Sequence, residues 1–162
     1  MKMTVLYYSK SGNTEKMANM IAEGMNCVEG AEAKAFSIDA VDLDWAKESR
    51  CIVLGTPTYM ADVAGVTKTY LESGLRQCEP AGKIGGAFAT ARYIYGGGEI
   101  GLQTILTHMM VSGMLTYSGG GALGMPVIHL GPVAIGDRLE ESEETFRIYG
   151  QRMAQKAAEL FK

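Results

Sequence analysis

Residues 3–14 read Met3-Thr4-Val5-Leu6-Tyr7-Tyr8-Ser9-Lys10-Ser11-Gly12-Asn13-Thr14, an apolar run followed by small and hydroxyl residues at the start of a helix-periodic stretch. The apolar run predicts a buried strand, and the periodic stretch predicts a helix. The first amides of a helix lack an intrahelical acceptor and lie at its positive end, and Ser and Thr hydroxyls add donors. Residues 9–14 are therefore a candidate binding site for a phosphate monoester. The alternative is that Ser11 or Asn13 only caps the helix.

Working outward from this junction, apolar runs alternate with helix-periodic stretches along the chain. The runs cover residues 3–8, 34–38, 51–55, 84–89 and 114–117. This alternation is typical of crossover units and a parallel sheet. We expect one α/β domain over residues 1–162, a doubly wound three-layer sandwich with a five-stranded parallel sheet.

Helices are predicted where apolar residues recur at steps of three and four. Two short ones are expected near residues 41–48 and 66–75, and Ser142 is expected to cap the last helix. Three longer helices should bury the stripes Met17, Ala18, Ile21, Ala22 and Met25; Leu102, Ile105, Leu106, Met109 and Met110; and Phe146, Tyr149, Met153, Ala157 and Leu160.

Residues 118–136 break the alternation, with six glycines, two prolines and no amphipathic period. They predict a long loop. Loops of this length inside a compact domain usually either shape a binding site or are poorly ordered. A binding site or a subunit contact is expected here, so a homo-oligomer stays open.

Composition excludes several classes of function. A net charge of -3 provides no basic field for nucleic acid, and no apolar run is long enough to insert into a membrane. The N-terminus lacks the pattern of a signal peptide, so a soluble cytoplasmic protein is expected. Cys27, Cys51 and Cys78 are scattered and are expected to be small core residues in a reducing compartment, without a metal cluster.

Two further loops should emerge at the same sheet edge as residues 9–14, because ligands of open parallel sheets bind beyond the carboxyl ends of the strands. Residues 55–62 follow the third strand, and we expect an open loop there, without a tight turn, in which Tyr59 can lie against a flat aromatic ligand. Residues 90–99 follow the fourth strand and combine tyrosines with glycines that allow close backbone approach. Three converging loops favour a cofactor site.

Other nucleotide and catalytic patterns find little support. Residues 96–101 and 119–124 both match G-x-G-x-x-G, but neither leads from a strand directly into a helix as a dinucleotide site requires. The P-loop pattern and the acidic cluster of a phospho-acceptor domain are absent. His108 is expected to pack beside a helix stripe, whereas His129 lies in the long loop, where it could face a substrate. Arg92 lies in the third loop, where it could contact an anionic substrate or the phosphate of NADPH.

The chain resembles flavodoxin-fold FMN proteins over its whole length. Its segments at residues 7–14, 55–59 and 96–99 are most similar to those of the flavodoxin-like NAD(P)H:quinone oxidoreductases. The resemblance implies the strand order 2-1-3-4-5 and FMN as cofactor. It also implies a phosphate site at Ser9, Lys10, Ser11, Gly12, Asn13 and Thr14, ring contacts at Pro57, Thr58, Tyr59 and Met60, and contacts to the polar edge of the ring at Thr90, Ala91, Tyr95, Gly96, Gly97 and Gly98.

The function implied is transfer of electrons from NAD(P)H, a transient donor, through FMN to a quinone or similar small acceptor, without a catalytic side chain. The alternative is a flavodoxin that carries electrons between protein partners. With 18 acidic and 15 basic residues, the chain lacks the strong acidic field that would steer a carrier to basic partners, which favours the enzyme. A cofactor-free interaction protein with the same fold is a third reading.

Two departures from the quinone oxidoreductases are visible. The segment Arg92-Tyr93-Ile94-Tyr95 is bulkier than their third loop, and their long insertion before the third strand is missing. Their tetrameric assembly is therefore not expected to carry over.

Overall fold

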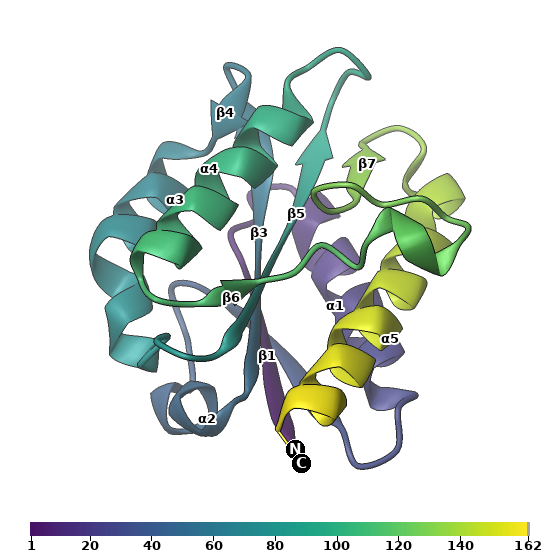
Figure 1. The fold of residues 1–162 in the computed structure, drawn as a ribbon. Helices are drawn as coiled ribbons and strands as arrows, with labels where there is room; N and C mark the ends of the chain where they lie inside the picture. Colours follow the sequence, from purple (N-terminus) through teal and green to yellow (C-terminus); the bar gives the residue numbers. More distant parts are fainter. Residues whose placement is uncertain (162) are drawn as a thin grey trace.

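The computed structural model describes residues 1–161 as an α/β sandwich, with a central sheet between two layers of helices (Figure 1). Its main strands follow the order β2-β1-β3-β5-β6. The strands are β1 (Lys2–Tyr7), β2 (Glu32–Ser37), β3 (Cys51–Tyr59), β4 (Asp62–Val63), β5 (Ile84–Ala91), β6 (Leu115–Thr116) and β7 (Val133–Ile135). The predicted fold class and the predicted order 2-1-3-4-5 are confirmed, since β5 and β6 are the fourth and fifth of the predicted strands.

The sheet differs from the prediction in its last position, which two short strands fill. β6 pairs with Ile84 and Gly85 at the start of β5, and β7 pairs in parallel with Ala89 to Ala91 at its end. The prediction that residues 118–136 are loop throughout is therefore wrong for β7. The glycines and prolines of this segment hid a three-residue apolar run that the edge of β5 orders by backbone pairing.

Helices cover both faces of the sheet (Figure 1). α1 (Asn13–Asn26) and α5 (Glu143–Leu160) lie on one face, while α2 (Leu43–Glu48), α3 (Gly65–Thr69) and α4 (Gly98–Val111) lie on the other. The predicted helix at residues 66–75 begins as α3, but it continues as a π-helical turn at Tyr70–Gly74 and a 3₁₀ turn at Leu75–Cys78.

The hydrophobic core has two parts, one on each side of the sheet. Most of the predicted stripe residues are buried in it. Met110 and Leu160 are not, with 55% and 54% of their surface exposed, because the last turns of α4 and α5 bury Met109 and Ala157 instead.

Two local predictions from the sequence are wrong. Ser142 precedes α5, but its side chain makes no capping hydrogen bond, because a 3₁₀ turn at Leu139–Ser142 runs directly into the helix. Cys27 is exposed at the end of α1, whereas Cys51 and Cys78 are buried. Burial raises the pKa of the Cys51 thiol to about 12, so this thiol is inert at physiological pH.

Arg152 of α5 organises the glycine-rich segment between β6 and β7. Its buried guanidinium donates to five backbone carbonyls, the shortest bond being 2.8 Å from Nη1 to the Pro126 oxygen. The other acceptors are the carbonyls of Gly120, Leu123, Gly124 and Met125. One side chain therefore satisfies five backbone acceptors of a segment that has little other regular structure.

Replacing Arg152 by methionine is expected to release this segment. The five carbonyls lose their donor, so hydrogen exchange and proteolytic cleavage at residues 120–126 should accelerate about tenfold or more. The matched control is Lys156→Met on the same helix, whose ammonium pairs with Glu159. Equal protection of residues 120–126 in both variants would contradict the role given to Arg152.

Candidate functional site

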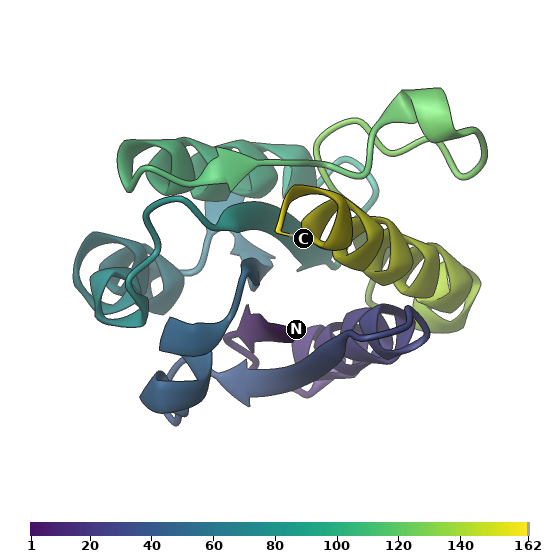
Figure 2. The ribbon, with the colours of Figure 1, turned by 60° about the horizontal axis from the view of Figure 1, so that its bottom comes forward.

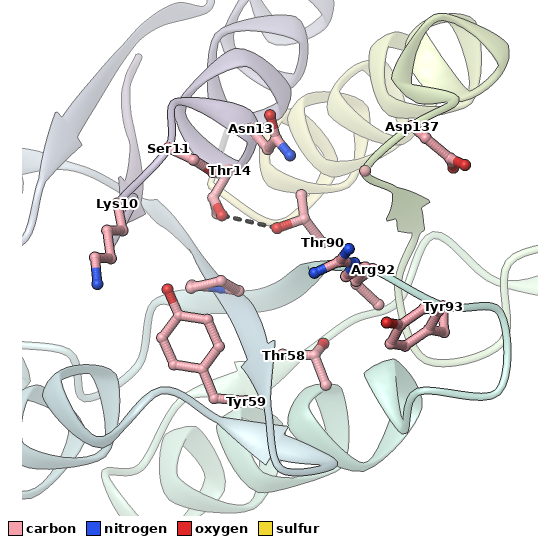
Figure 3. Close-up of a pocket in the computed structure, with 13 residues that line it drawn as sticks. Lys10, Ser11, Asn13, Thr14, Thr58, Tyr59, Thr90, Arg92, Tyr93 and Asp137 are labelled. Carbon is pink, nitrogen blue, oxygen red and sulfur yellow. Dashed lines mark hydrogen bonds between the residues drawn. The ribbon is translucent and has the colours of Figure 1, made fainter.

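A cavity of about 570 Å³ lies at the carboxyl ends of β1, β3 and β5 (Figure 3). The three predicted loops and the turn after β7 form its walls. The lining residues are Lys10, Ser11, Asn13, Thr14, Pro57, Thr58, Tyr59, Thr90, Ala91, Arg92, Tyr93, Gly136 and Asp137. The sheet thus brings together segments that are up to 127 positions apart in sequence, as an edge of parallel strands does.

The first wall of the cavity is the loop between β1 and α1. Gly12 adopts the left-handed conformation, with φ of 88°, and its N–H donates to Ser9 Oγ over 3.1 Å. A side chain at this φ would be strained, so glycine suits the turn. No side chain caps α1, so the alternative that Ser11 or Asn13 caps the helix is wrong. The first amides of α1 therefore stay available to an anion.

A buried hydrogen bond joins this loop to the one after β5. Thr14 Oγ1 and Thr90 Oγ1 lie 2.8 Å apart, and both residues are almost fully buried (Figure 3). Each hydroxyl can accept as well as donate, so one of them keeps a proton for a further acceptor. The bond fixes two walls of the cavity relative to each other.

The second wall is a β-hairpin and not the open loop that the sequence predicted. Thr58 pairs with Val63 and Tyr59 with Asp62, which leaves only Met60 and Ala61 in the turn. Their φ angles of 52° and 63° match the two central positions of the type I′ turn that closes two-residue hairpins. Because neither residue is glycine, asparagine or aspartate, the sequence carries no signal for such a turn. The positive φ angles at Met60 and Ala61 store backbone strain beside the cavity.

Thr58 supplies a polar atom without a partner in the described structure. Its Oγ1 is buried and makes no hydrogen bond among residues 1–161. Thr58 lines the main cavity and also an adjoining, mostly apolar cavity of about 500 Å³ that includes Met60, Ala61 and Gly96. Buried polar side chains normally have a partner, so this hydroxyl indicates a ligand group between the two cavities.

The third wall is the segment after β5. Gly97 has φ of 87°, and a Cβ there would lie 2.6 Å from the Cβ of Ala61. A Cβ at Gly98 would lie 2.7 Å from Cγ1 of Val133. These two glycines therefore allow the neighbouring loops to pack and do not line either cavity. Tyr95 also lines neither cavity, because its side chain is fully exposed.

Nine of the sixteen predicted cofactor residues line the main cavity, and Met60 and Gly96 line the adjoining one. Ser9 and Gly12 line neither cavity, but the hydrogen bond between them shapes the loop. Tyr93, Gly136 and Asp137 were missed as lining residues. Gly136 and Asp137 follow β7, so the apolar run Val133–Ile135 before a glycine and an acid was the signal for them.

The charges around the cavity are few and mostly exposed. Lys10 and Arg92 contribute cations and Asp137 a carboxylate, and the Arg92 guanidinium lies 5.5 Å from the centre of the Tyr93 ring. Figure 3 places Thr58 between Tyr59 and Tyr93. Partial burial, and secondarily Tyr8, raise the pKa of Tyr59 above its ordinary value, so its phenol is neutral at physiological pH.

Neither histidine lines this cavity. His108 Nδ1 lies 2.8 Å from the carbonyl of Thr104 in its own helix, as expected of a packed side chain. His129 lines a different cavity, between α4 and the residues before β7. Among residues 1–161 the structure contains no group of acids, cysteines and histidines suited to a metal ion. None of the described helices is long and apolar enough to cross a membrane.

The fold and the site together define a doubly wound α/β protein with a mononucleotide-sized cavity at the carboxyl edge of its sheet. Comparison with known proteins supports this class. The flavodoxin family model matches residues 5–94. A flavodoxin of Clostridium saccharobutylicum is 44% identical over 161 residues, covering 99% of this chain and all of that protein. The chain belongs to the flavodoxin family.

Two further matches have lower sequence identity. An NAD(P)H dehydrogenase (quinone) of Chromohalobacter salexigens is 30% identical over 200 aligned positions that cover 98% of each chain. Among solved structures, a flavodoxin from the domain Archaea superposes with a TM-score of 0.80 at 26% identity, covering 98% of this chain and 99% of that one.

Family membership implies FMN as the cofactor, and the described residues fit that group. The open N-terminus of α1 with Ser11 and Thr14 suits a phosphate dianion held by uncharged donors. The unpartnered Thr58 Oγ1 lies where a polar ring edge would satisfy it, and Tyr59 and Tyr93 offer aromatic surface. The carboxylate of Asp137 is an acceptor suited to hydroxyl groups of the ligand.

Proposed function

We propose that this chain is an FMN-dependent electron carrier that accepts electrons from one protein and delivers them to another. The observation that carries the proposal is the match to a flavodoxin of the same extent, at 44% identity and with both chains covered end to end. The flavodoxin carrier, which was the alternative interpretation of the sequence, is therefore favoured over the quinone oxidoreductase.

The comparison with the quinone dehydrogenase points the same way. Its alignment spans 200 positions, whereas this chain has 162 residues, so the dehydrogenase carries internal segments without a counterpart here. This agrees with the missing insertion noted in the sequence. A substrate site that depends on such a segment is not available in this chain.

The surface around the cavity suits docking of a protein. Apolar side chains with large exposed fractions stand beside the two cavities: Tyr59, Met60, Tyr93, Ile94 and Tyr95. Exposed apolar clusters of this kind mark interaction surfaces. Association driven by apolar contact does not need the strong acidic field that the sequence lacks, so the charge argument against a carrier loses its weight.

In this proposal the chain binds and orients the cofactor, and bound FMN supplies the electron chemistry. The amides and hydroxyls of residues 9–14 hold the phosphate, and the Thr14–Thr90 bond keeps that loop in register with the third wall. Thr58 Oγ1 would supply a hydrogen-bonding group to the ring. Tyr59 and Tyr93 would limit the access of water to it.

Steady-state kinetics of the FMN-loaded protein tests the proposal. With NADH or NADPH and a soluble quinone, we expect no turnover above that of free FMN. Adding a separate NADPH-dependent flavodoxin reductase should start electron flow to a protein acceptor such as cytochrome c. Rapid NAD(P)H oxidation by this chain alone would instead establish the quinone reductase, the second candidate. Protein that binds no added FMN would exclude both.

A further inference from the structure

A second cavity of about 590 Å³ lies at the opposite end of the sheet, where the strands begin. It is lined by the end of α2, the residue before β3, the 3₁₀ turn at Leu75–Cys78 with the residues after it, and the residue that follows α4. Figure 2 views the molecule from this end, with both chain termini in front. The cavity is as large as the candidate flavin site and shares no residue with it.

The lining of this second cavity is positively charged, whereas the whole chain is negatively charged. Four cationic side chains line it, Lys47, Arg50, Arg76 and Lys83, against the single carboxylate of Glu79. The whole chain has a net charge of -3. Within residues 1–161, no carboxylate oxygen lies within 4.0 Å of the charged groups of Lys47, Arg50 or Arg76. All three are exposed, and the Arg50 guanidinium lies 5.5 Å from the centre of the Phe161 ring.

Lys83 makes the floor of this cavity suitable for an anion. Its buried ammonium donates to the carbonyls of Ala46, Lys47 and Cys78 over 2.8, 2.7 and 2.7 Å. The carbonyls of Ala46 and Lys47 belong to the last turn of α2, which would otherwise repel an anion. These three bonds use all three N–H donors of the Lys83 ammonium. Lys83 therefore holds a positive charge at this place, and the donors for a ligand come from Lys47, Arg50 and Arg76.

We propose that this cavity binds a small ligand carrying a diphosphate group. Arginine matches phosphate oxygens in a two-pronged geometry, and Arg50 and Arg76 stand on different elements around one hollow. A diphosphate carries more charge and more acceptor oxygens than a single phosphate, so it can use more of these cations at once. The Ser112 hydroxyl adds a neutral donor at the rim. The site is independent of the FMN site.

Titration calorimetry with inorganic pyrophosphate, at low ionic strength and in saturating FMN, tests this proposal. Arg50→Gln and Arg76→Gln should each weaken pyrophosphate binding about tenfold, since each removes a charge-assisted bond pair. Glu79→Gln should tighten it severalfold, because it removes the one repelling charge. The control Lys156→Gln changes the net charge equally but stands outside the cavity, and it should stay within twofold of the wild type.

Three results would overturn the assignment. They are the absence of pyrophosphate binding to the FMN-saturated wild type, a loss in Lys156→Gln equal to that in Arg50→Gln, and pyrophosphate binding that occurs only when FMN is left out. The last result would place the anion at residues 9–14. The opposite signs expected for Arg76→Gln and Glu79→Gln keep the test decisive even if Arg50→Gln, which removes a contact with the Phe161 ring, is poorly folded.

Discussion

Ser11→Ala is expected to weaken FMN binding about tenfold or more. The side chain of Ser11 lines the main cavity at the uncapped start of α1 and is exposed, so alanine disturbs little of the fold. A hydrogen bond to a charged group contributes about 1.5 to 3 kcal/mol, which corresponds to the expected loss of affinity. Titration of the FMN-free protein with FMN, followed by quenching of flavin fluorescence, measures the change.

Riboflavin is the control, because it carries the same ring without the phosphate. Its affinity should be nearly the same for Ser11→Ala and for the wild type, and an equal loss for both ligands would contradict the phosphate assignment. Thr14→Ala should also weaken FMN binding, but it breaks the bond to Thr90 as well. A partial loss of riboflavin affinity in Thr14→Ala alone would therefore report the coupling between the two walls.

The sequence predicted the layers and the strand order because both follow from long apolar runs and helical periods. Those signals are strong for β1, β3 and β5, which are buried on both faces. They fail for β7, where three residues are ordered by pairing with Ala89 to Ala91 and not by their own pattern. Such tertiary ordering cannot be read from a window of local sequence.

The candidate site was predictable to the extent that it follows the ends of long strands. Topology brings the ends of β1, β3 and β5 to one edge, so residues 10–14, 57–59 and 90–91 meet there. The turn at Met60 and Ala61 was not predictable, because two residues without turn propensity adopt left-handed φ angles there. Tyr93 lines the cavity and Tyr95 points away from it, although both belong to the same loop. No simple sequence pattern distinguishes these two tyrosines.

Gly150→Ala is expected to destabilise the protein by about 3 kcal/mol. α1 and α5 lie side by side on one face of the sheet, and each places a glycine against the backbone of the other (Figure 1). A Cβ at Gly150 would lie 2.2 Å from the carbonyl oxygen of Ile21, and one at Gly24 would lie 2.0 Å from that of Arg147. Backbone cannot move aside as a flexible side chain can, so the helices must separate and the core must repack.

The sign of this effect distinguishes packing from helix propensity. Alanine is favoured over glycine inside a helix by about 1 kcal/mol, so propensity alone predicts that Gly150→Ala stabilises the protein. Gly101→Ala in α4 is the matched control, because its Cβ would make only ordinary contacts, the nearest at 3.6 Å from Thr56. Urea unfolding of the FMN-free variants should therefore give opposite shifts of the midpoint, a gain for Gly101→Ala and a loss for Gly150→Ala. A gain in both would mean that α1 and α5 tolerate a wider separation than the glycine contacts imply.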